Sequence, residues 1–249
     1  MLEPNPLEGK TALVTGGAAR LGAMSARFLH AAGAHVVIHY RSSAAAAEAL
    51  RDELEADRPG SVTLVQGDLL DLDVLHRFVE RCLEATGSLD VLINNASNYF
   101  PTPLERVTEA QWESLFGVNA KAPFFLSREA APHLRARRGC IINMVDIHAE
   151  RPNPGYPVYS MAKAANAMMV KALARELAPE VRVNGVAPGA ILWPEGAEGE
   201  KSKEQALPRI PLGRAGAPEQ IARTVLFLAT TDYITGQIIA VDGGRSIQQ

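Results

Sequence analysis

Residues 11–22 read TALVTGGAARLG, and this stretch decides the fold class that the sequence predicts. Its β-branched start is typical of a strand, and a helical pattern begins at about Leu21. Gly16, Gly17 and Gly22 lie between the two. Such glycines allow a tight turn, and they let backbone N–H groups at a helix N-terminus approach a phosphate. The spacing is not G-x-G-x-x-G, so a loop that merely reverses the chain is the alternative to a phosphate-binding turn.

Short apolar runs alternate with helical stretches along the rest of the chain. Each run is apolar on both faces, which is typical of strands in a parallel sheet that is covered on two sides. We predict an α/β fold: a single doubly wound domain over residues 1–249, with a parallel sheet of about seven strands and helices on both faces. The further strands are expected at 35–40, 62–66, 89–94, 140–145, 181–188 and 237–242, and the helices at 21–32, 43–57, 71–85, 108–118, 121–137, around Tyr159 up to 178, and 218–230.

One connection, 189–217, is rich in proline and glycine and is too long for an ordinary loop in a compact domain. We interpret it as a substrate lid, with a disordered loop as the alternative. Trp193 lies within it, where it either covers a substrate or packs against the protein.

The composition of the 249-residue chain is that of an ordinary globular protein, with 47% hydrophobic and 21% charged residues. The formal net charge of −3 gives no reason to expect binding to nucleic acid or to an anionic membrane. Cys82 and Cys140 form no C-x-x-C motif and the six histidines lack metal-ligand spacing, so neither a disulfide nor a metal site is expected. The start of the chain does not resemble a signal peptide and no apolar run approaches 18 residues, so a cytoplasmic location is expected.

The end of the second predicted strand indicates which dinucleotide is bound. A carboxylate there would bind the ribose 2′-hydroxyl of NAD, whereas an arginine accommodates the 2′-phosphate of NADP. The chain reads HYRSS at 39–43, with no acidic residue before Glu48. The guanidinium of Arg41 and the hydroxyls of Ser42 and Ser43 suit a phosphate dianion. We therefore predict NADPH as the cofactor; a solvated surface arginine is the alternative.

A candidate acid pair lies near the middle of the chain. YSMAK (159–163) places Tyr159 and Lys163 four residues apart in a helical stretch, so both side chains project from one face. A nearby cation favours the phenolate and makes a tyrosine a general acid or base. Asp146 lies thirteen residues before Tyr159. A carboxyl group beside the tyrosine suggests a substrate with more than one basic atom; an Asp146 that only caps a local turn is the alternative.

Together these motifs resemble the short-chain dehydrogenase/reductases over essentially the whole chain. The matching features are TGGAARLG, Asp68, NNAS at 94–97, Asn119, YSMAK and NGVAPG at 184–189. The resemblance implies a Rossmann-type fold and a homotetramer. It implies Tyr159 as the proton donor, Lys163 as the residue that holds the nicotinamide ribose and lowers the tyrosine pKa, and Asn119 as the support of a proton-relay water. The cofactor-binding residues expected from the resemblance and from the arginine segment are Gly16, Arg20, Leu21, Gly22, Tyr40, Arg41, Ser42, Ser43, Asp68, Leu69, Asn95, Ala96, Ser97, Pro188 and Gly189.

Two departures from the usual pattern narrow the resemblance to the pteridine reductase branch. Arg20 stands where the usual T-G-x-x-x-G-x-G pattern has its middle glycine, and Asp146 replaces the usual catalytic serine. The branch implies that Arg20 and Ser97 contact both cofactor and substrate, that Tyr99 stacks on the pterin ring, and that Asp146 works with Tyr159 on ring protonation. Tyr99 as an aromatic that packs in its own loop is the alternative for that residue.

The predicted function is thus an NADPH-dependent pteridine reductase that takes a dihydropterin, and also dihydrofolate or an oxidised pterin, to the tetrahydro form. A carbonyl reductase of the same superfamily, such as a 3-oxoacyl thioester reductase, is the alternative enzyme. A non-catalytic NADPH sensor is the alternative from another class, although a sensor has no use for Tyr159 and Lys163. His148, two residues after Asp146, is interpreted as a surface-loop residue rather than a site residue.

Overall fold

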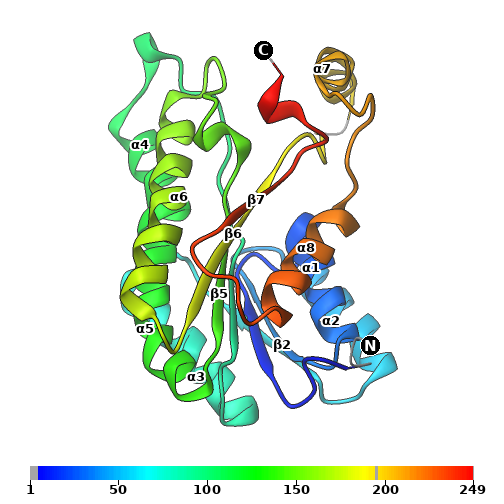
Figure 1. Ribbon diagram of the computed structural model, residues 1–249, viewed down its shortest axis with the longest axis vertical. Coiled ribbons are helices and arrows are strands. Elements are labelled where there is room, and N and C mark those ends of the chain that lie inside the picture. Colours follow the sequence, from blue (N-terminus) through cyan, green and yellow to red (C-terminus); the bar gives the residue numbers. More distant parts are fainter. Residues whose placement is uncertain (1–4, 194–195, 249) are drawn as a thin grey trace.

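The computed structural model describes residues 5–193 and 196–248, and its centre is a parallel sheet of seven strands (Figure 1). The strand order is β3-β2-β1-β4-β5-β6-β7, and every neighbouring pair is parallel. The chain winds outward from β1 first in one direction and then, from β4, in the other, which confirms the predicted doubly wound sheet. The strands are β1 (Thr11–Val14), β2 (His35–Tyr40), β3 (Val62–Gln66), β4 (Val91–Asn94), β5 (Cys140–Met144), β6 (Arg182–Pro188) and β7 (Ile238–Val241).

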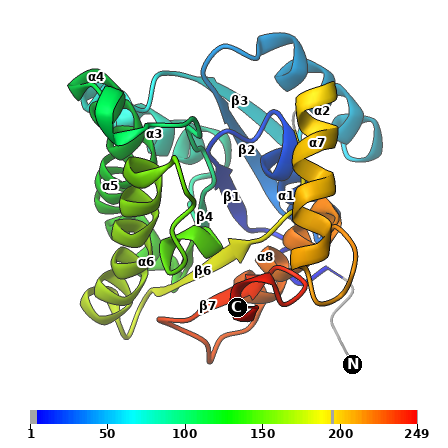
Figure 2. The same ribbon diagram turned by 90° about the horizontal axis from the view of Figure 1, so that it is seen from above.

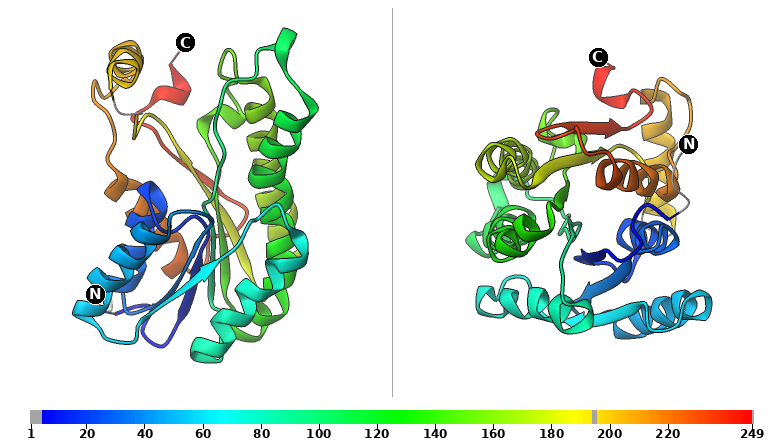
Figure 3. Two further views of the ribbon diagram at one scale, coloured as in Figure 1. Left: turned by 180° about the vertical axis from the view of Figure 1, so that it is seen from behind. Right: turned by 60° about the horizontal axis from the view of Figure 1, so that its bottom comes forward.

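Helices cover both faces of the sheet (Figures 2 and 3). One layer holds α1, α2 and α8, and the other holds α3, α5 and α6, with α4 packed against α6. This is the two-faced cover that strands without a polar face require. The helices are α1 (Arg20–Ala31), α2 (Ala44–Asp57), α3 (Leu75–Thr86), α4 (Glu109–Phe116), α5 (Ala122–Arg137), α6 (Pro157–Leu177), α7 (Ala197–Ala206) and α8 (Pro218–Thr230).

The alternation of side chains along each strand divides the core in two. In β1, Ala12 and Val14 pack with the layer of α1 and α8, whereas Leu13 packs with α3 and α5. All three side chains are fully buried. Because successive residues of a strand point to opposite faces, each apolar strand contributes to both cores, and this burial is the main force that holds the layers together.

The predicted helices are confirmed, with local differences at their ends. The helix expected from residue 71 starts at Leu75, because the side chain of Asp71 accepts the Asp73 N–H and begins a 3₁₀ turn, η1 (Leu72–Val74). The helices expected at 108–118 and 121–137 are continuous through a π-helical turn, η3 (Gly117–Lys121). Within the described residues, no helix is both long and apolar enough to cross a membrane.

The connection 189–217 holds more structure than a loop. It contains α7 and a 3₁₀ turn, η5 (Leu207–Arg209), and it lies beyond the end of β6, near the C-terminal turn η6 (Arg245–Ile247) in Figures 1 and 2. Both ends are attached to the domain, since Ile191 and Ile210 are buried. Its role as a lid remains a proposal.

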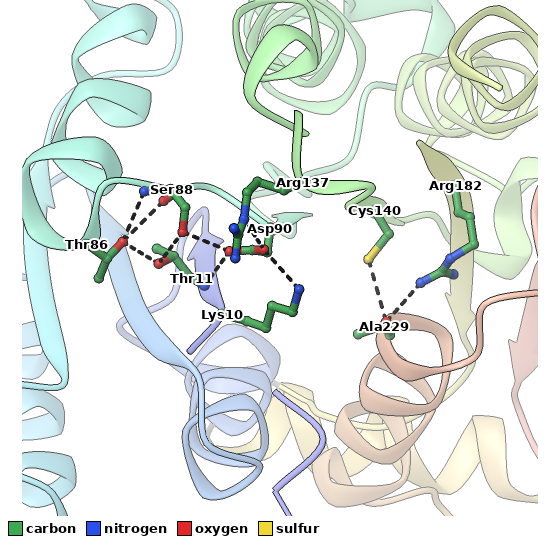
Figure 4. A network of polar contacts seen from close by, with 9 residues as sticks. All are labelled: Lys10, Thr11, Thr86, Ser88, Asp90, Arg137, Cys140, Arg182 and Ala229. Carbon is green, nitrogen blue, oxygen red and sulfur yellow. Dashed lines mark hydrogen bonds and ion pairs between the residues drawn. The ribbon is translucent and has the colours of Figure 1, made fainter. Parts of the chain in front are cut away.

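A buried carboxylate ties together the opposite edge of the sheet, where the strands begin (Figure 4). Asp90, which is only 3% exposed, accepts hydrogen bonds from the Thr11 N–H, the Ser88 hydroxyl and the Arg137 guanidinium, each at 3.0 Å. The ammonium group of Lys10 lies 3.4 Å from Asp90 Oδ1. A buried carboxylate is tolerated only with such partners, and here they join β1, β4 and α5.

Removal of this carboxylate is predicted to destabilise the fold. Asp90→Ala is expected to lower the free energy of unfolding by about 2–3 kcal/mol, because it leaves the buried Thr11 N–H without an acceptor and leaves two cations unpaired. Urea unfolding followed by circular dichroism measures the change. Asp232→Ala, at an exposed position, is the control and is expected to stay within about 0.5 kcal/mol of the parent.

Candidate active site

The predicted dinucleotide loop lies at the carboxyl ends of β1 and β4, where the strand order reverses and doubly wound folds bind their ligands. Thr15 joins the two loops that meet there. Its hydroxyl accepts the backbone N–H groups of Asn95 at 2.9 Å and Ala96 at 3.1 Å, and the Asn95 side chain donates to the Thr15 carbonyl at 2.8 Å. A Cβ at Gly22 would collide with the Gly16 carbonyl and the Asn95 amide. The fold therefore brings these predicted residues together, and only glycine fits at 22.

The loop after β1 has the chemistry of an anion site. The backbone N–H groups of residues 18–22 have no hydrogen-bond acceptor among the described residues. Helix α1 begins here without a side-chain cap and without an acidic residue in its first turn. Unpaired N–H groups at the positive end of a helix dipole bind anions. These donors fit the pyrophosphate of a dinucleotide, and no side chain of the helix competes for them.

Arg20 has a backbone conformation that favours glycine. Its φ is +52°, in the left-handed region, which costs a non-glycine residue about 1–2 kcal/mol. Its side chain is exposed and has no hydrogen-bond or salt-bridge partner in the described part of the chain. A strained residue whose side chain makes no hydrogen bond or ion pair with the described residues is typical of a ligand-binding position.

The arginine segment follows β2 at the same edge of the sheet. Arg41, Ser42 and Ser43 are exposed, Tyr40 is half-buried, and the Arg41 carbonyl is fixed by the Gln66 side chain at 3.0 Å. Just after the neighbouring strand, β3, Asp68 accepts the Leu70 N–H at 3.0 Å while Leu69 is buried. Two strands, β1 and β4, separate this segment from β5 and the predicted acid pair. That separation suits an elongated ligand laid across the sheet edge.

Asp146 and Tyr159 are in direct contact. The Tyr159 hydroxyl donates a hydrogen bond of 2.7 Å to Asp146 Oδ2. The other carboxylate oxygen, Oδ1, accepts the His148 N–H at 2.8 Å and caps a 3₁₀ turn, η4 (Ile147–Ala149). One oxygen of Asp146 therefore caps the turn and the other contacts the phenol, while a part for Asp146 in protonation of a substrate stays a prediction.

Lys163 lies one helical turn after Tyr159 and is 2% exposed. Its ammonium group is 5.7 Å from the centroid of the Tyr159 ring and donates to the Met144 carbonyl at 2.8 Å. Burial lowers the pKa of Lys163 to about 8, and the charge of Asp146 opposes this change. The lysine is thus placed against the ring rather than the hydroxyl of the tyrosine.

The pKa of Tyr159 is raised well above its ordinary value, first by burial and then by the charge and the hydrogen bond of Asp146, while the polar side chain of Ser97 opposes the rise. Lys163 is not among the causes of this change: the carboxylate accepts the hydrogen bond of the hydroxyl, whereas the ammonium lies 5.7 Å from the ring centroid, so its expected lowering of the tyrosine pKa stays a prediction. Tyr159 is accordingly a protonated phenol over the neutral range, which is the form that can donate a proton.

Asn119 lies in the π-helical turn η3 and is fully buried. Its Oδ1 accepts the Ser97 hydroxyl at 2.7 Å, and its amide donates to the carbonyls of Asn98 and Leu115 at 2.9 Å each. The π-helical turn, which often marks functional sites, offsets this residue from the regular helix. Ser97 and Asn119, which were predicted separately as site residues, therefore form a single hydrogen-bonded unit.

A buried row of amides supports that unit, and the sequence reasoning missed it. Asn166 donates to the Asn119 carbonyl at 2.7 Å, Asn143 donates to Asn166 at 3.0 Å, and Asn94 donates to Asn143 at 2.9 Å. The row links β4, β5 and α6 to the π-helical turn. Polar residues in otherwise apolar strands, at 94 and 143, are the one sequence signal for it.

Tyr99 lies in an aromatic group beside the acid pair. Its ring stacks on Tyr156 with centroids 4.6 Å apart and an interplanar angle of 9°, and it meets Tyr159 edge-on at 4.7 Å. The Asn153 side chain donates to its hydroxyl at 3.1 Å. With 53% of Tyr99 exposed, part of the ring remains available to a flat ligand. Tyr156 and Asn153 were not predicted, because only the fold brings them to Tyr99.

The last predicted cofactor-binding residues lie at the end of β6, the strand next to β5. Pro188 ends β6, and the N–H of the following Gly189 donates to the Val241 carbonyl at 3.1 Å. A Cβ at Gly189 would approach the Asp242 backbone to 2.6 Å, so this position requires glycine.

His148 uses Nδ1 to bond the Arg151 carbonyl at 2.9 Å, which is a contact within its own loop. Among the described residues, no group of His, Cys, Asp or Glu could hold a metal ion.

Comparison with known proteins assigns the chain to a protein family. The family model described as Enoyl-(Acyl carrier protein) reductase matches residues 17–246. The 3-oxoacyl-[acyl-carrier-protein] reductase FabG of Thermotoga maritima is 38% identical over 246 residues, which cover 97% of this chain and 99% of the relative. The chain belongs to the short-chain dehydrogenase/reductase superfamily. As a member, it is an oxidoreductase with the predicted Rossmann-type domain, and its cofactor is a nicotinamide dinucleotide.

Other relatives in this superfamily carry different names. Pteridine reductase 1 of Leishmania tarentolae is 36% identical over 278 residues, which cover 95% of this chain and 96% of the relative. The 3beta-hydroxysteroid dehydrogenase 1 of Eggerthella lenta is 35% identical over 251 residues, with 97% and 95% coverage. Because the sequence identities to these relatives are so similar, they do not indicate which relative's substrate this protein uses. The substrate must therefore be argued from the short-chain reductase site itself.

Proposed function

We propose that the protein is an NADPH-dependent pteridine reductase, which reduces a ring C=N bond of a dihydropterin to the tetrahydro form. The observation that carries the proposal is the 2.7 Å hydrogen bond between the Tyr159 hydroxyl and the Asp146 carboxylate. It places a second proton-transfer group directly on the superfamily's tyrosine, at the position where the usual pattern has a serine.

Reduction of a C=N bond needs a hydride at carbon and a proton at nitrogen. The reduced dinucleotide supplies the hydride when it is bound. Tyr159 is kept protonated by burial and by Asp146, so it can give up its proton only when a nitrogen develops charge beside it. Asp146 accepts the Tyr159 hydrogen bond as a carboxylate and carries no proton itself. After Tyr159 has given up its proton, Asp146 can take one from solvent and pass it to the phenolate, which a serine hydroxyl does less well.

The surroundings of the acid pair match a flat, polar heteroaromatic ring. Tyr99, beside the acid pair, offers an exposed aromatic face, and Ser97 offers a hydroxyl to a ring edge. The exposed guanidinium of Arg20 is a further group that we expect to bond the ring edge. The strained backbone of Arg20 supports a ligand role for this side chain. Together they provide stacking and edge recognition, which a simple ketone does not require.

A 3-oxoacyl thioester reductase is the competing function, and it is favoured by the 38% identity to the Thermotoga maritima protein. A ketone presents one oxygen to the acid, and for it a hydroxyl beside Tyr159 suffices. A ketone presents no further basic atom that Asp146 could contact, whereas a pterin ring does. The carboxylate therefore supports the pterin over the ketone.

A substrate panel tests the proposal. Purified protein is assayed for oxidation of NADPH with dihydrobiopterin, dihydrofolate and an acetoacetyl thioester, under identical conditions. We expect kcat/KM for the dihydropterin to exceed that for the thioester by at least about 10²-fold, the usual size of a general acid–base contribution. Good turnover of the thioester with none of either pterin compound would overturn the proposal.

The preference for NADPH is proposed to depend on Arg41. Arg41→Ala is expected to lower the ratio of kcat/KM for NADPH to that for NADH about 10-fold, because a charge-assisted hydrogen bond to the 2′-phosphate contributes roughly 1.5–3 kcal/mol. Steady-state kinetics with both cofactors measures the ratio. Arg51→Ala on α2, whose side chain pairs with Asp52, is the control. An unchanged ratio in Arg41→Ala would remove the assignment.

We also propose a homotetramer, as the resemblance to the superfamily implies. Helices α4, α5 and α6 expose large apolar side chains, which a subunit interface would cover: Trp112, Phe124, Met161 and Met168. Light scattering of the purified protein measures the assembly.

A further inference from the structure

His39 connects three cofactor-binding segments, although it is buried under them and is 2% exposed. The Gly16 N–H, in the loop after β1, donates to His39 Nδ1 at 3.1 Å. On the other side of the ring, Nε2 lies 3.1 Å from the Gly67 carbonyl, directly before Asp68. The His39 carbonyl also accepts the Gly17 N–H at 2.9 Å. Two successive N–H groups of the loop are thus held by one residue of β2.

These contacts fix the protonation state of the ring. Nδ1 accepts from a backbone N–H and so must keep its lone pair, whereas Nε2 faces a carbonyl and so must carry the proton. The ring is therefore the neutral Nε2–H tautomer. Burial lowers the pKa of His39 to about 4, opposed by the Gly67 hydrogen bond and by the charge of Asp68. The Phe78 ring of α3 lies against it, with centroids 4.6 Å apart.

The consequence for the loop is geometric. Gly16 has a φ of +60°, so without a fixed partner this residue has several accessible conformations. The Gly16 N–H points inward and donates to His39. Residues 18–22 come next in the chain, and their backbone N–H groups have no acceptor among the described residues. A loop held in this way does not have to be ordered when a phosphate binds, which increases affinity.

We propose that His39 is a positioning residue of the dinucleotide site: its Nδ1 holds the Gly16 backbone and so sets the affinity for the cofactor. The proposal uses the cofactor loop alone and is independent of the pterin assignment. It concerns binding and not the proton transfer at Tyr159, because β1 and β4 lie between β2 and β5.

Two isosteric substitutions separate the two ring contacts. In His39→Asn, the amide oxygen stands at the position of Nδ1 and can accept the Gly16 N–H. In His39→Gln, the amide nitrogen reaches the position of Nε2 and can donate to Gly67, while the acceptor for Gly16 is lost. In His39→Leu, both contacts are lost. The dissociation constant for NADPH is measured by isothermal titration calorimetry without any substrate, together with the melting temperature.

We expect Kd for NADPH to rise at least about 10-fold in His39→Leu and in His39→Gln, because each variant loses the hydrogen bond to Gly16 and leaves the loop mobile. In His39→Asn, Kd should stay within about 3-fold of the parent. In kinetics, KM for NADPH should rise while kcat changes little. His30→Leu is the matched control: His30 is also a buried histidine, bonded to Ser61 at 2.7 Å, but lies away from the loop. It should lower the melting temperature and leave Kd unchanged.

A parental Kd in His39→Leu, or an equal rise of Kd in His30→Leu, would overturn the proposal. If His39→Leu does not fold, the asparagine and glutamine variants decide, and equal Kd values for these two would overturn it. The titration contains no pterin. A negative result in the substrate panel would therefore not affect the interpretation of the Kd values for NADPH.

Discussion

Tyr159→Phe is expected to lower kcat at least about 10³-fold while Kd for NADPH stays within about 3-fold of the parent. The hydroxyl is the group that donates to Asp146, and its pKa is raised so that it remains a proton donor at neutral pH. Loss of a positioned general acid typically costs 10²–10⁴-fold in rate. The ring itself is retained, so its contacts with Tyr99 and with the Lys163 ammonium are kept.

The measurement is single-turnover reduction with saturating NADPH, alongside calorimetric titration of the cofactor. Tyr233→Phe is the control, because Tyr233 is 99% exposed and should behave as the parent. A kcat within 10-fold of the parent would show that another group delivers the proton. A parallel loss of NADPH affinity would show instead that the hydroxyl supports the fold of the site.

The fold could be predicted because its signals are local. Apolar runs with a strand period, such as 35–40, alternate with helical stretches bounded by caps and glycines, and this alternation specifies a parallel sheet. The π-helical turn at 117–121 could not be predicted, because the segment reads as two ordinary helices. Asn166 and the carbonyl of Asn119, which meet only after α6 packs on the turn, fix this local conformation.

The site was predictable to the extent that its residues share one motif. Tyr159, Lys163 and Asp146 were placed by spacing, and the fold brings them together. The direction of the Tyr159 pKa was not predictable, because it depends on whether the carboxylate or the ammonium contacts the hydroxyl. His39 was missed, although its place in the strand HVVIHY gave a signal: it shares a face with Val37, so a buried polar ring needed a partner.

Asp146→Asn is expected to lower dihydropterin turnover about 10²-fold while NADPH affinity and the melting temperature stay near those of the parent. The asparagine oxygen can still accept the His148 N–H, so the cap of η4 is kept. What is lost is the negative charge beside Tyr159, together with the ability to exchange a proton. Since that charge and its hydrogen bond both raise the Tyr159 pKa, this pKa should fall in the variant.

The second variant, Asp146→Ser, separates the two candidate substrates. Serine restores the hydroxyl of the usual superfamily pattern, which suffices for proton transfer to a single carbonyl oxygen. If Asp146 serves the ring nitrogens of a pterin, the ratio of pterin to thioester turnover should fall about 10²-fold or more in this variant. Equal losses for both substrates would assign the carboxylate a purely structural role at η4, because a cap has no preference for a substrate. The ratio, measured on one purified protein with two substrates, therefore decides whether the carboxylate on Tyr159 takes part in selecting the reaction.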